Sequence, residues 1–433
     1  MDPALKPIRF SSYLRLIQEN SNFRRLWAAQ IVSEIGDCFY SLAVYSLFLE
    51  STGQAGSVAF ALVLQVLPQT FIGPTAGMVN DRVRRKRVMI AADLGRMLVV
   101  LVMLLAQFRS MIWLVCPLLL TETTMAAFFE PARSSVIPSI TTSEDLVLAN
   151  TLSTTTWSVN VVLGAMLGGL IAAVLGRNAV FVLNAFSFLV SALLIRGMRF
   201  EEPHAKAAAP LRLRDLLDYS PMVEGVRYVR RDFRLMATVL VKAGLLVMGP
   251  SWVVFTVMAN RHFAVPWHGL DPQRGGMVGM SLLLGARGLG ALLGPLFSAR
   301  WAGHADGRLR LGILVAFAAQ AVGYAALGNS NVLWLACPCI ALAHSGDSTA
   351  WVFSTTLLQL NTEVQMRGRI FATDLGFSSI TIALGTYLAG LFLDRGVSAH
   401  AVAGATGLLM LIPTVAWGCS MKFLKPRPCL ATA

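Results

Sequence analysis

The stretch G-M-V-N-D-R-V-R-R-K-R, from Gly77 to Arg87, decides the fold because it lies between two long apolar runs. The run before it, from Ser51 to Asn80, contains no charged residue, and only Asp93 and Arg96 interrupt the run that follows. A short basic segment between two apolar runs is typical of a cytoplasmic loop that joins two transmembrane helices. This stretch therefore predicts a helical membrane protein with the loop on the cytoplasmic side.

The composition indicates a chain that lies mostly within a lipid bilayer, which is therefore its expected partner. Of the 433 residues, 55% are hydrophobic and only 14% are charged, whereas soluble domains carry roughly 25% charged residues. The mean hydropathy is +0.63. We therefore expect many membrane crossings rather than a globular enzyme with one anchor. Residues 1–21 have no apolar core and no small-residue cleavage site, so no signal peptide is expected.

Twelve segments are apolar and long enough to span a bilayer, which requires about 20 residues. Each is expected to be α-helical, because the lipid interior offers no other partner for backbone polar groups. The twelve segments are 27–49, 56–79, 88–107, 112–132, 147–175, 178–198, 235–259, 276–299, 309–328, 332–356, 370–393 and 401–421. The predicted fold class is thus an all-α polytopic membrane protein.

A long polar stretch divides the twelve segments into two sets of six. It contains an Ala-rich linker from Ala205 to Pro210 and a predicted surface helix from Leu211 to Asp232. The basic turn from Asp306 to Arg310 lies after the second segment of the C-terminal six, as the basic turn at Asp81 lies after the second segment of the N-terminal six. This correspondence indicates a duplicated six-helix unit around a central cavity, which is a transporter architecture. The predicted parts are an N-terminal bundle (1–198), a cytoplasmic linker (199–234), and a C-terminal bundle with a short tail (235–433).

Lys and Arg are distributed unequally between the two sides of the predicted membrane. With the N-terminus in the cytoplasm, 28 of the 36 Lys and Arg residues fall on the cytoplasmic side or at its helix ends, five on the other side and three inside helices. Basic residues favour cytoplasmic loops, so both termini are expected in the cytoplasm. The expected location of the protein is the plasma membrane, that is, the bacterial inner membrane. The same distribution explains the net charge of +13 without a nucleic-acid partner.

The basic loop has the spacing G-x-x-x-D-R-x-x-R-K, which resembles the loop between helices 2 and 3 of the major facilitator superfamily. One difference is Arg84, where that family usually has a second Gly. The resemblance implies a Gly at a close helix contact, an Asp near a helix end, and basic residues that gate the cytoplasmic side. The implied gate residues are Gly77, Asp81, Arg82, Arg85, Lys86 and, at the start of the eleventh segment, Asp374. Without the resemblance, the alternative is a basic loop that only sets topology.

Further stretches resemble one branch of that superfamily, the drug-export-type proteins that include macrolide efflux pumps and the enterobactin exporter. They include N-F-R-R-L-W (22–27), R-V-M-I-A-A-D-L-G-R (87–96), P-A-R-S-S-V-I-P (131–138), F-V-L-N-A-F-S-F-L-V-S-A (181–192), G-A-R-G-L-G-A-L-L-G (285–294) and R-G-R-I-F-A (367–372). They occur along the whole chain in the family's order. The resemblance implies the major facilitator fold and secondary transport, without naming a cargo.

Ionisable residues inside a membrane are costly to bury, so each is expected to have a function or a partner. The resemblance implies that helices 1, 4, 7 and 10 line the cavity. The ionisable residues on these helices and in the middle of helix 8 are Glu34, Asp37, Glu122, Lys242, Arg287, His344 and Asp347. We predict that they include the proton-coupling and cargo-binding groups.

Glu34 and Asp37 are three residues apart and so share one helix face. Burial and mutual repulsion disfavour two adjacent charged carboxylates, so one of them is expected to hold a proton. The alternative is structural ion pairing, for example of Asp37 with Lys242 or of Asp347 with Arg287. Two further pairs are expected from the same spacing of three: Asp93 with Arg96 (or either with the basic loop), and Glu130 with Arg133.

The predicted function is proton-coupled export of small organic molecules by a monomer that works by alternating access. The sequence has no nucleophile–base constellation, phosphate-binding loop or metal-ligand cluster, so neither an enzyme nor a cofactor is expected. Its six Cys show no zinc or disulfide spacing. A lipid or lysolipid flippase of the same fold is the main alternative, and a transporter-shaped sensor or scaffold is another. An excess of acidic over basic groups in the cavity favours a cationic or zwitterionic cargo.

Overall fold

The computed structural model describes residues 10–107, 109–142, 145–202, 219–244, 246, 249–265, 272–302, 305–363 and 366–424. The elements in chain order are α1 (Phe10–Glu19), α2 (Ser21–Thr52), α3 (Ala55–Arg82), α4 (Arg85–Met103), η1 (Leu104–Gln107), η2 (Arg109–Leu114), α5 (Val115–Ile140), α6 (Leu146–Leu175), α7 (Arg177–Arg196), α9 (Ser220–Arg231), α10 (Phe233–Leu240), η4 (Val241–Gly244), α12 (Ser251–Arg261), α13 (Pro272–Ala302), α14 (Asp306–Gly328), α15 (Leu333–Asn361), α16 (Arg367–Asp394), α17 (Ala399–Leu409) and α18 (Leu411–Ser420). No strand occurs in these ranges, and the prediction of an all-α protein is confirmed.

Most of the helices have the length and composition of membrane spans. Nine helical runs in the described ranges are long and apolar enough to cross a bilayer. Two more helices, α5 with 26 residues and α15 with 29, exceed the length that a span requires. The protein is therefore a multi-pass membrane protein.

The seventh predicted segment, 235–259, is not one continuous helix. α10 ends at Leu240, a 3₁₀ turn follows to Gly244, and α12 begins only at Ser251, after Pro250. Proline has no N–H with which to continue a helical ladder. Thr386 of α16 donates its hydroxyl to the Gly249 carbonyl at 2.8 Å, which satisfies a backbone group that the break exposes.

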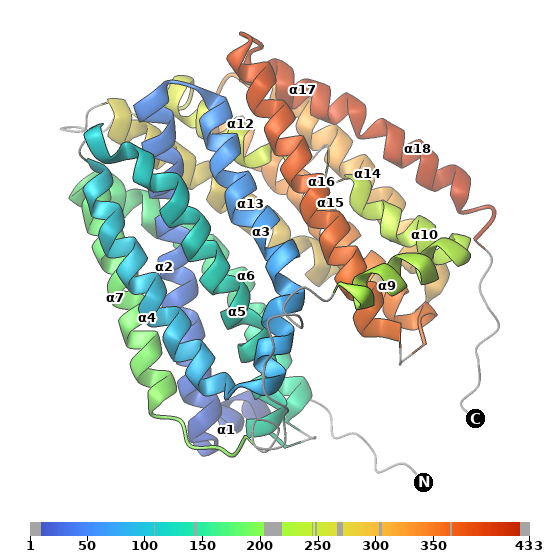
Figure 1. Cartoon of the computed structure of the whole chain (residues 1–433). Helices are drawn as coiled ribbons and strands as arrows, with labels where there is room; N and C mark the ends of the chain where they lie inside the picture. Colours follow the sequence, from blue (N-terminus) through green and yellow to red (C-terminus); the bar gives the residue numbers. More distant parts are fainter. Residues whose placement is uncertain are drawn as a thin grey trace.

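The helices form two groups that lie side by side (Figure 1). Helices up to α7 pack mainly on one another, and so do the helices from α9 onward. Two long contacts join the groups: α3 packs against α16, and α6 packs against α13. Gly169 of α6 lies against Met277 and Ser281 of α13, so the absence of a side chain allows the two backbones to approach closely.

The predicted linker is described only in part. The Ala-rich segment 205–210 and residues 211–218 of the predicted surface helix lie outside the described residues. The remainder of that helix is α9, which packs against α16. Within the described residues the helix begins at Ser220. It packs against the C-terminal group of helices.

The helices begin and end at two opposite ends of the molecule, the basic end and the far end (Figure 1). The basic end carries the turn between α3 and α4, with Arg84, and the end of α7. The far end carries the turn between α2 and α3, at Gly53, and the turn after α16, at Gly396. Both of these glycines have a positive φ (68° and 88°), which residues with a Cβ adopt only with strain.

Candidate functional site

One guanidinium joins carboxylates from two other helices at the centre of the N-terminal group. Arg96 of α4 donates from Nη2 to both carboxylate oxygens of Asp37 on α2, at 2.8 and 2.7 Å. It also donates from Nε to Glu122 of α5 at 2.8 Å. The side chains of Arg96 and Glu122 are only 6% and 8% exposed, whereas that of Asp37 is 34% exposed. Asp37 is therefore the most exposed member of this Arg96 cluster.

The Arg96 cluster differs from the pairing expected along α4. Arg96 lies over the Phe188 ring, with Cζ 4.1 Å from its centroid, and Asp93 accepts a hydrogen bond from Ser191 of α7 at 2.6 Å. Among the described contacts there is no ion pair between Asp93 and Arg96, and the predicted pairing is wrong for these two residues. The reason is that Arg96 extends toward α2 and α5, while Asp93 contacts α7.

Glu34 has its own set of partners, one helical turn from Asp37. Its carboxylate accepts hydrogen bonds from Gln30 at 2.8 Å and from Asn160 at 2.9 Å, and Arg133 lies 3.8 Å away. Arg133 also forms the predicted ion pair with Glu130, at 2.7 Å. Glu34 and Asp37 therefore share a helix but not their donors, so a proton shared directly between them is not the arrangement seen here.

A second buried ion pair lies in the C-terminal group. Lys242 of η4 donates to Asp374 of α16 at 2.9 Å, and the two side chains are 2% and 6% exposed. The Lys242 ammonium also lies 3.5 Å from the centroid of the Trp351 ring. Lys242 and Asp37 thus each have a different partner, and the pair suggested between them is not formed. Asp374, which the resemblance implied as a gate residue, is held by Lys242.

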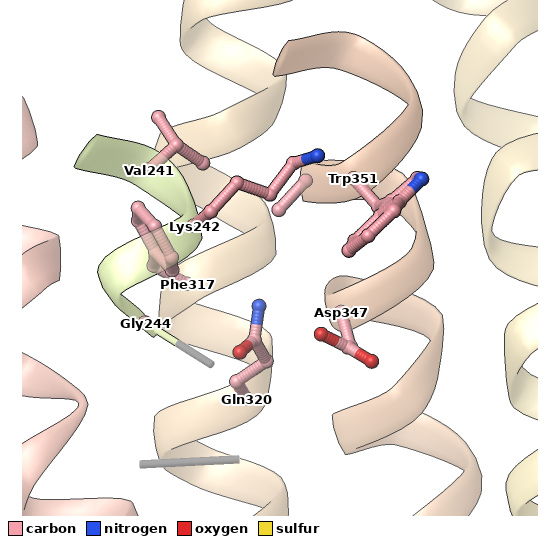
Figure 2. A pocket seen from close by; sticks show the side chains of 8 residues that line it. Val241, Lys242, Gly244, Phe317, Gln320, Asp347 and Trp351 are labelled. Atoms are coloured by element: carbon pink, nitrogen blue, oxygen red, sulfur yellow. The ribbon is translucent and has the colours of Figure 1, made fainter. Parts of the chain in front are cut away.

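Next to this pair is a small pocket in which Gln320 of α14 and Asp347 of α15 face each other (Figure 2). The volume of the cavity is about 10 Å³, room for about one water molecule. His344 Nδ1 lies 3.6 Å from Asp347, and its Nε2 lies 3.2 Å from the Tyr324 hydroxyl. The pocket is too small for an organic cargo, so its groups act on one another or on water in this conformation.

Arg287 of α13 lies at the boundary between the two groups of helices. Its Cζ is 4.4 Å from the Trp252 ring, which in turn makes an edge contact with the ring of Tyr45 on α2, centroids 5.8 Å apart. Tyr45 donates a hydrogen bond to Gln65 of α3. Within the described residues, the Nε of Arg287 has no hydrogen-bond partner, and Arg287 forms no ion pair with Asp347.

The basic stretch forms the turn between α3 and α4. Arg85 donates to the Ser135 carbonyl at 3.0 Å and Lys86 to the Met198 carbonyl at 2.7 Å, so the turn is tied to α5 and to the residues after α7. Arg82 is at the end of α3. The side chain of Asp81 lies outside those that the structure describes.

The implied close helix contact at Gly77 is not present. Within the part of the chain that the structure describes, a Cβ added at Gly77, or at Gly73 one turn earlier, would meet no atom of a neighbouring element within 4 Å. The reason is visible in Figure 1, where the two groups of helices diverge toward the basic end. Among the described residues, α3 is contacted at this end by Tyr219, which donates its hydroxyl to the Phe71 carbonyl at 3.0 Å, but not at Gly73 or Gly77.

The far end, in contrast, is closed across the two groups. Asp394, the last residue of α16, accepts hydrogen bonds from the backbone N–H groups of Ala55 at 2.7 Å and Gly56 at 2.8 Å. Gly390, one turn earlier, lies against Gly56 and Ala59. A carboxylate at a helix N-terminus satisfies free N–H groups and interacts favourably with the helix dipole. Asp394 thus caps α3 of the other group.

This arrangement of helices is that of a major facilitator transporter. A solved POT family transporter in complex with a thioalcohol-conjugated peptide superposes with a TM-score of 0.70, at 12% identity, over 93% of this chain and 96% of that one. The sequence profile of the transmembrane secretion effector family matches residues 14–426. The chain therefore belongs to this family, within the macrolide-efflux branch of the major facilitator superfamily.

Two relatives are similar along most of their length. Macrolide efflux protein A of Streptococcus pyogenes is 23% identical over 380 residues, which cover 86% of this chain and 89% of the relative. The putative bacilysin exporter BacE of Bacillus amyloliquefaciens is 22% identical over 397 residues, 91% of this chain and 94% of the relative. The protein is thus a transporter rather than an enzyme.

Sequence reasoning identified Asp37 and Glu122 as candidates but missed the residue that joins them. The spacing of three favours Asp93, or the basic loop, as the partner of Arg96. The available signal was composition: Arg96 is one of three basic residues inside predicted helices, and it is the one in the N-terminal six. Asp394 was also missed, because a cap on a helix 339 residues away leaves no local pattern.

Proposed function

We propose that this protein is a proton-coupled exporter that moves small organic molecules out of the cell by alternating access. The observation that carries the proposal is the Arg96 cluster, in which two carboxylates share one guanidinium and only Asp37 is substantially exposed. The names of the two relatives, an efflux protein and a putative exporter, support the outward direction.

The Arg96 cluster has the charge balance that a proton carrier needs. With both carboxylates ionised it carries one net negative charge, and one proton on Asp37 makes it neutral. An uncompensated charge inside a membrane is unfavourable, so protonation of Asp37 and closure of the cavity around it favour each other. Protonation also removes one of the two Asp37 acceptors of Arg96 Nη2, while the bond from Nε to Glu122 is unaffected.

Alternation would use the two contacts that join the groups of helices. In this proposal the predicted bundles, residues 1–198 and 235–433, rock about the α3–α16 and α6–α13 contacts. We place the basic end in the cytoplasm, with both termini on that side, so that the far end, which Asp394 closes in this conformation, faces the outside. In the opposite state the basic turn, including Asp81, Arg82, Arg85 and Lys86, would approach the C-terminal bundle and gate the cavity.

Cargo would bind at the boundary where Arg287, Trp252 and Tyr45 meet. Aromatic rings beside a charged group suit an organic molecule with both apolar and polar parts. The excess of acidic groups in the sequence no longer favours a cation, because Asp37, Glu122 and Asp374 each contact a basic side chain. One monomer contains all the groups that this proposal uses.

The test of coupling is the substitution Asp37→Asn, which keeps the shape of the side chain and removes the titrating group. In proteoliposomes with a macrolide as probe, this variant should lose proton-driven uphill transport by at least tenfold. Exchange of labelled for unlabelled probe should continue, because exchange needs the cavity but no net proton movement. The matched control is Glu363→Gln, which removes an exposed carboxylate outside the clusters.

Two results would contradict the proposal. Full proton-driven transport by both Asp37→Asn and Glu122→Gln would exclude the Arg96 cluster as the carrier. Movement of a fluorescent lysolipid between leaflets, without macrolide flux in the parent protein, would support the flippase instead.

A further inference from the structure

A second cavity lies at the basic end, away from the Arg96 cluster and from the boundary between the groups. Its volume is about 610 Å³, and it is formed by the start of α4 and the residues that follow α7. Its lining includes four basic residues, Arg84, Lys86, Arg87 and Arg199, and two acidic ones, Glu201 and Glu202. The basic residues therefore outnumber the acidic ones by two.

The contacts within this cavity leave much of its positive charge uncompensated. Glu202 accepts a hydrogen bond from the backbone N–H of Lys86 at 3.3 Å, and the Lys86 ammonium donates to a carbonyl. The side chains of Arg84, Arg87 and Arg199 form no ion pair with any described residue. Three exposed guanidinium groups thus border one cavity, and each offers N–H donors in a planar fork that matches a phosphate.

The cavity continues into an apolar surface along α4. Arg87, Ile90, Leu94 and Leu98 follow one another at intervals of three or four residues, so they share one face of the helix. Ile90 lines the cavity, and Leu94 and Leu98 beyond it are exposed. In a membrane protein such a surface is covered by lipid chains. Met198 and Phe200 add apolar lining on the α7 side.

We propose that this cavity binds the headgroup of an anionic phospholipid, whose acyl chains lie along the exposed face of α4. Clusters of basic residues at the ends of membrane helices attract anionic headgroups, and the arginines supply bidentate donors for the phosphate. The continuous apolar face selects a lipid over a soluble phosphate, because a soluble phosphate makes no use of it. The bound lipid would fasten the α3–α4 turn to the end of α7.

Binding can be measured on the full-length protein without any transport assay, so the result is independent of the proposed function. The purified protein in a neutral detergent is titrated with short-chain phosphatidylglycerol, and thermal unfolding is followed. Phosphatidylglycerol should raise the unfolding temperature at lower concentration than phosphatidylcholine of the same chain length. The double variant Arg87→Gln/Arg199→Gln should bind phosphatidylglycerol on the order of 30-fold more weakly, while Arg300→Gln, an exposed arginine outside the cavity, should bind as the parent does.

Four comparisons make the result decisive. Glycerol 3-phosphate at the same concentrations tests for a soluble ligand, and an equal stabilisation by it would overturn the lipid assignment. Equal effects of phosphatidylglycerol and phosphatidylcholine, or unchanged binding by the double variant, would also overturn it. If the double variant does not fold, Glu201→Gln tests the reverse direction: removal of this exposed negative charge should tighten phosphatidylglycerol binding several-fold, and unchanged binding would count against the site.

Discussion

Arg96 shows how one residue can set the charge of a buried region. Its guanidinium contacts Asp37 and Glu122 from two other helices, and its side chain is almost fully buried. The free energy of such an arrangement is asymmetric: a buried ion pair contributes little net stability when complete, but loss of one partner leaves an uncompensated charge. Arg96 therefore matters more for stability than either carboxylate, since each acid can take up a proton and the guanidinium cannot release one.

The first prediction follows from this asymmetry. Arg96→Gln leaves the buried Glu122 and the partly exposed Asp37 without a cation and should destabilise the protein by about 3–5 kcal/mol. Asp37→Asn leaves Arg96 paired with Glu122 and should have a much smaller effect. Thermal unfolding of the purified variants measures the difference. The ranking would be refuted if Arg96→Gln unfolded at the same temperature as Asp37→Asn. The triple variant Arg96→Gln/Asp37→Asn/Glu122→Gln should recover part of the loss.

At the scale of elements, the α3–α16 contact combines helix capping with close packing. The backbone N–H groups at the start of α3 have no acceptor within their own helix, and Asp394 supplies one from the other group. Gly390 allows α16 to approach α3 at the same place. Because the acceptor and the donors belong to different groups of helices, this cap exists only while the far end is closed.

The second prediction concerns this cap. Asp394→Ala removes an N-terminal cap, an effect of about 0.5–2 kcal/mol, and the loss falls only on the state with the far end closed. The ratio of open to closed far ends should therefore rise about two- to thirtyfold. The distance between spin labels at Thr52 and Val397, in a variant that lacks the native cysteines, measures this ratio. In Asp394→Ala the population with the longer distance between the labels should be larger.

The matched control for the cap is Glu50→Gln. It breaks an ion pair at the same end, but Glu50 and Arg177 both belong to the N-terminal group. This substitution should leave the distance distribution unchanged. Identical distributions for Asp394→Ala and the parent would show that the cap does not stabilise the closed far end.

For the molecule as a whole, the sequence predicted the helices far better than their contacts. A membrane requires apolar length, a property that can be read along one segment at a time. Contacts between helices depend on how each helix is rotated about its axis, and segments that are apolar on all sides give little sign of this rotation. The Lys242–Asp374 pair joins residues 132 apart, and nothing in either segment indicates its partner.

The interruption of the seventh segment has a different physical origin. Its mean hydropathy is that of a continuous span, but the α-helix ends at Leu240 and α12 begins after Gly249 and Pro250, where Thr386 of α16 compensates. The Gly-Pro pair could have indicated a break. The compensating hydroxyl comes from a distant segment and could not. The same holds for the site. Asp37 and Glu122 could be recognised because a charged group inside a membrane has a high free energy. Their shared partner, Arg96, could not, because it depends on how three helices pack.

The last prediction tests the orientation on which the direction of transport depends. Single cysteines at Thr52 and Arg84, in a background without the six native cysteines, mark the far end and the basic end. Basic residues are retained in the cytoplasm, so a membrane-impermeant maleimide added to intact cells should label Thr52→Cys and not Arg84→Cys. Arg84→Cys should react once the cells are permeabilised, which shows that the position is accessible. Labelling of Arg84→Cys in intact cells would invert the topology, and the far end, which Asp394 closes here, would then face the cytoplasm.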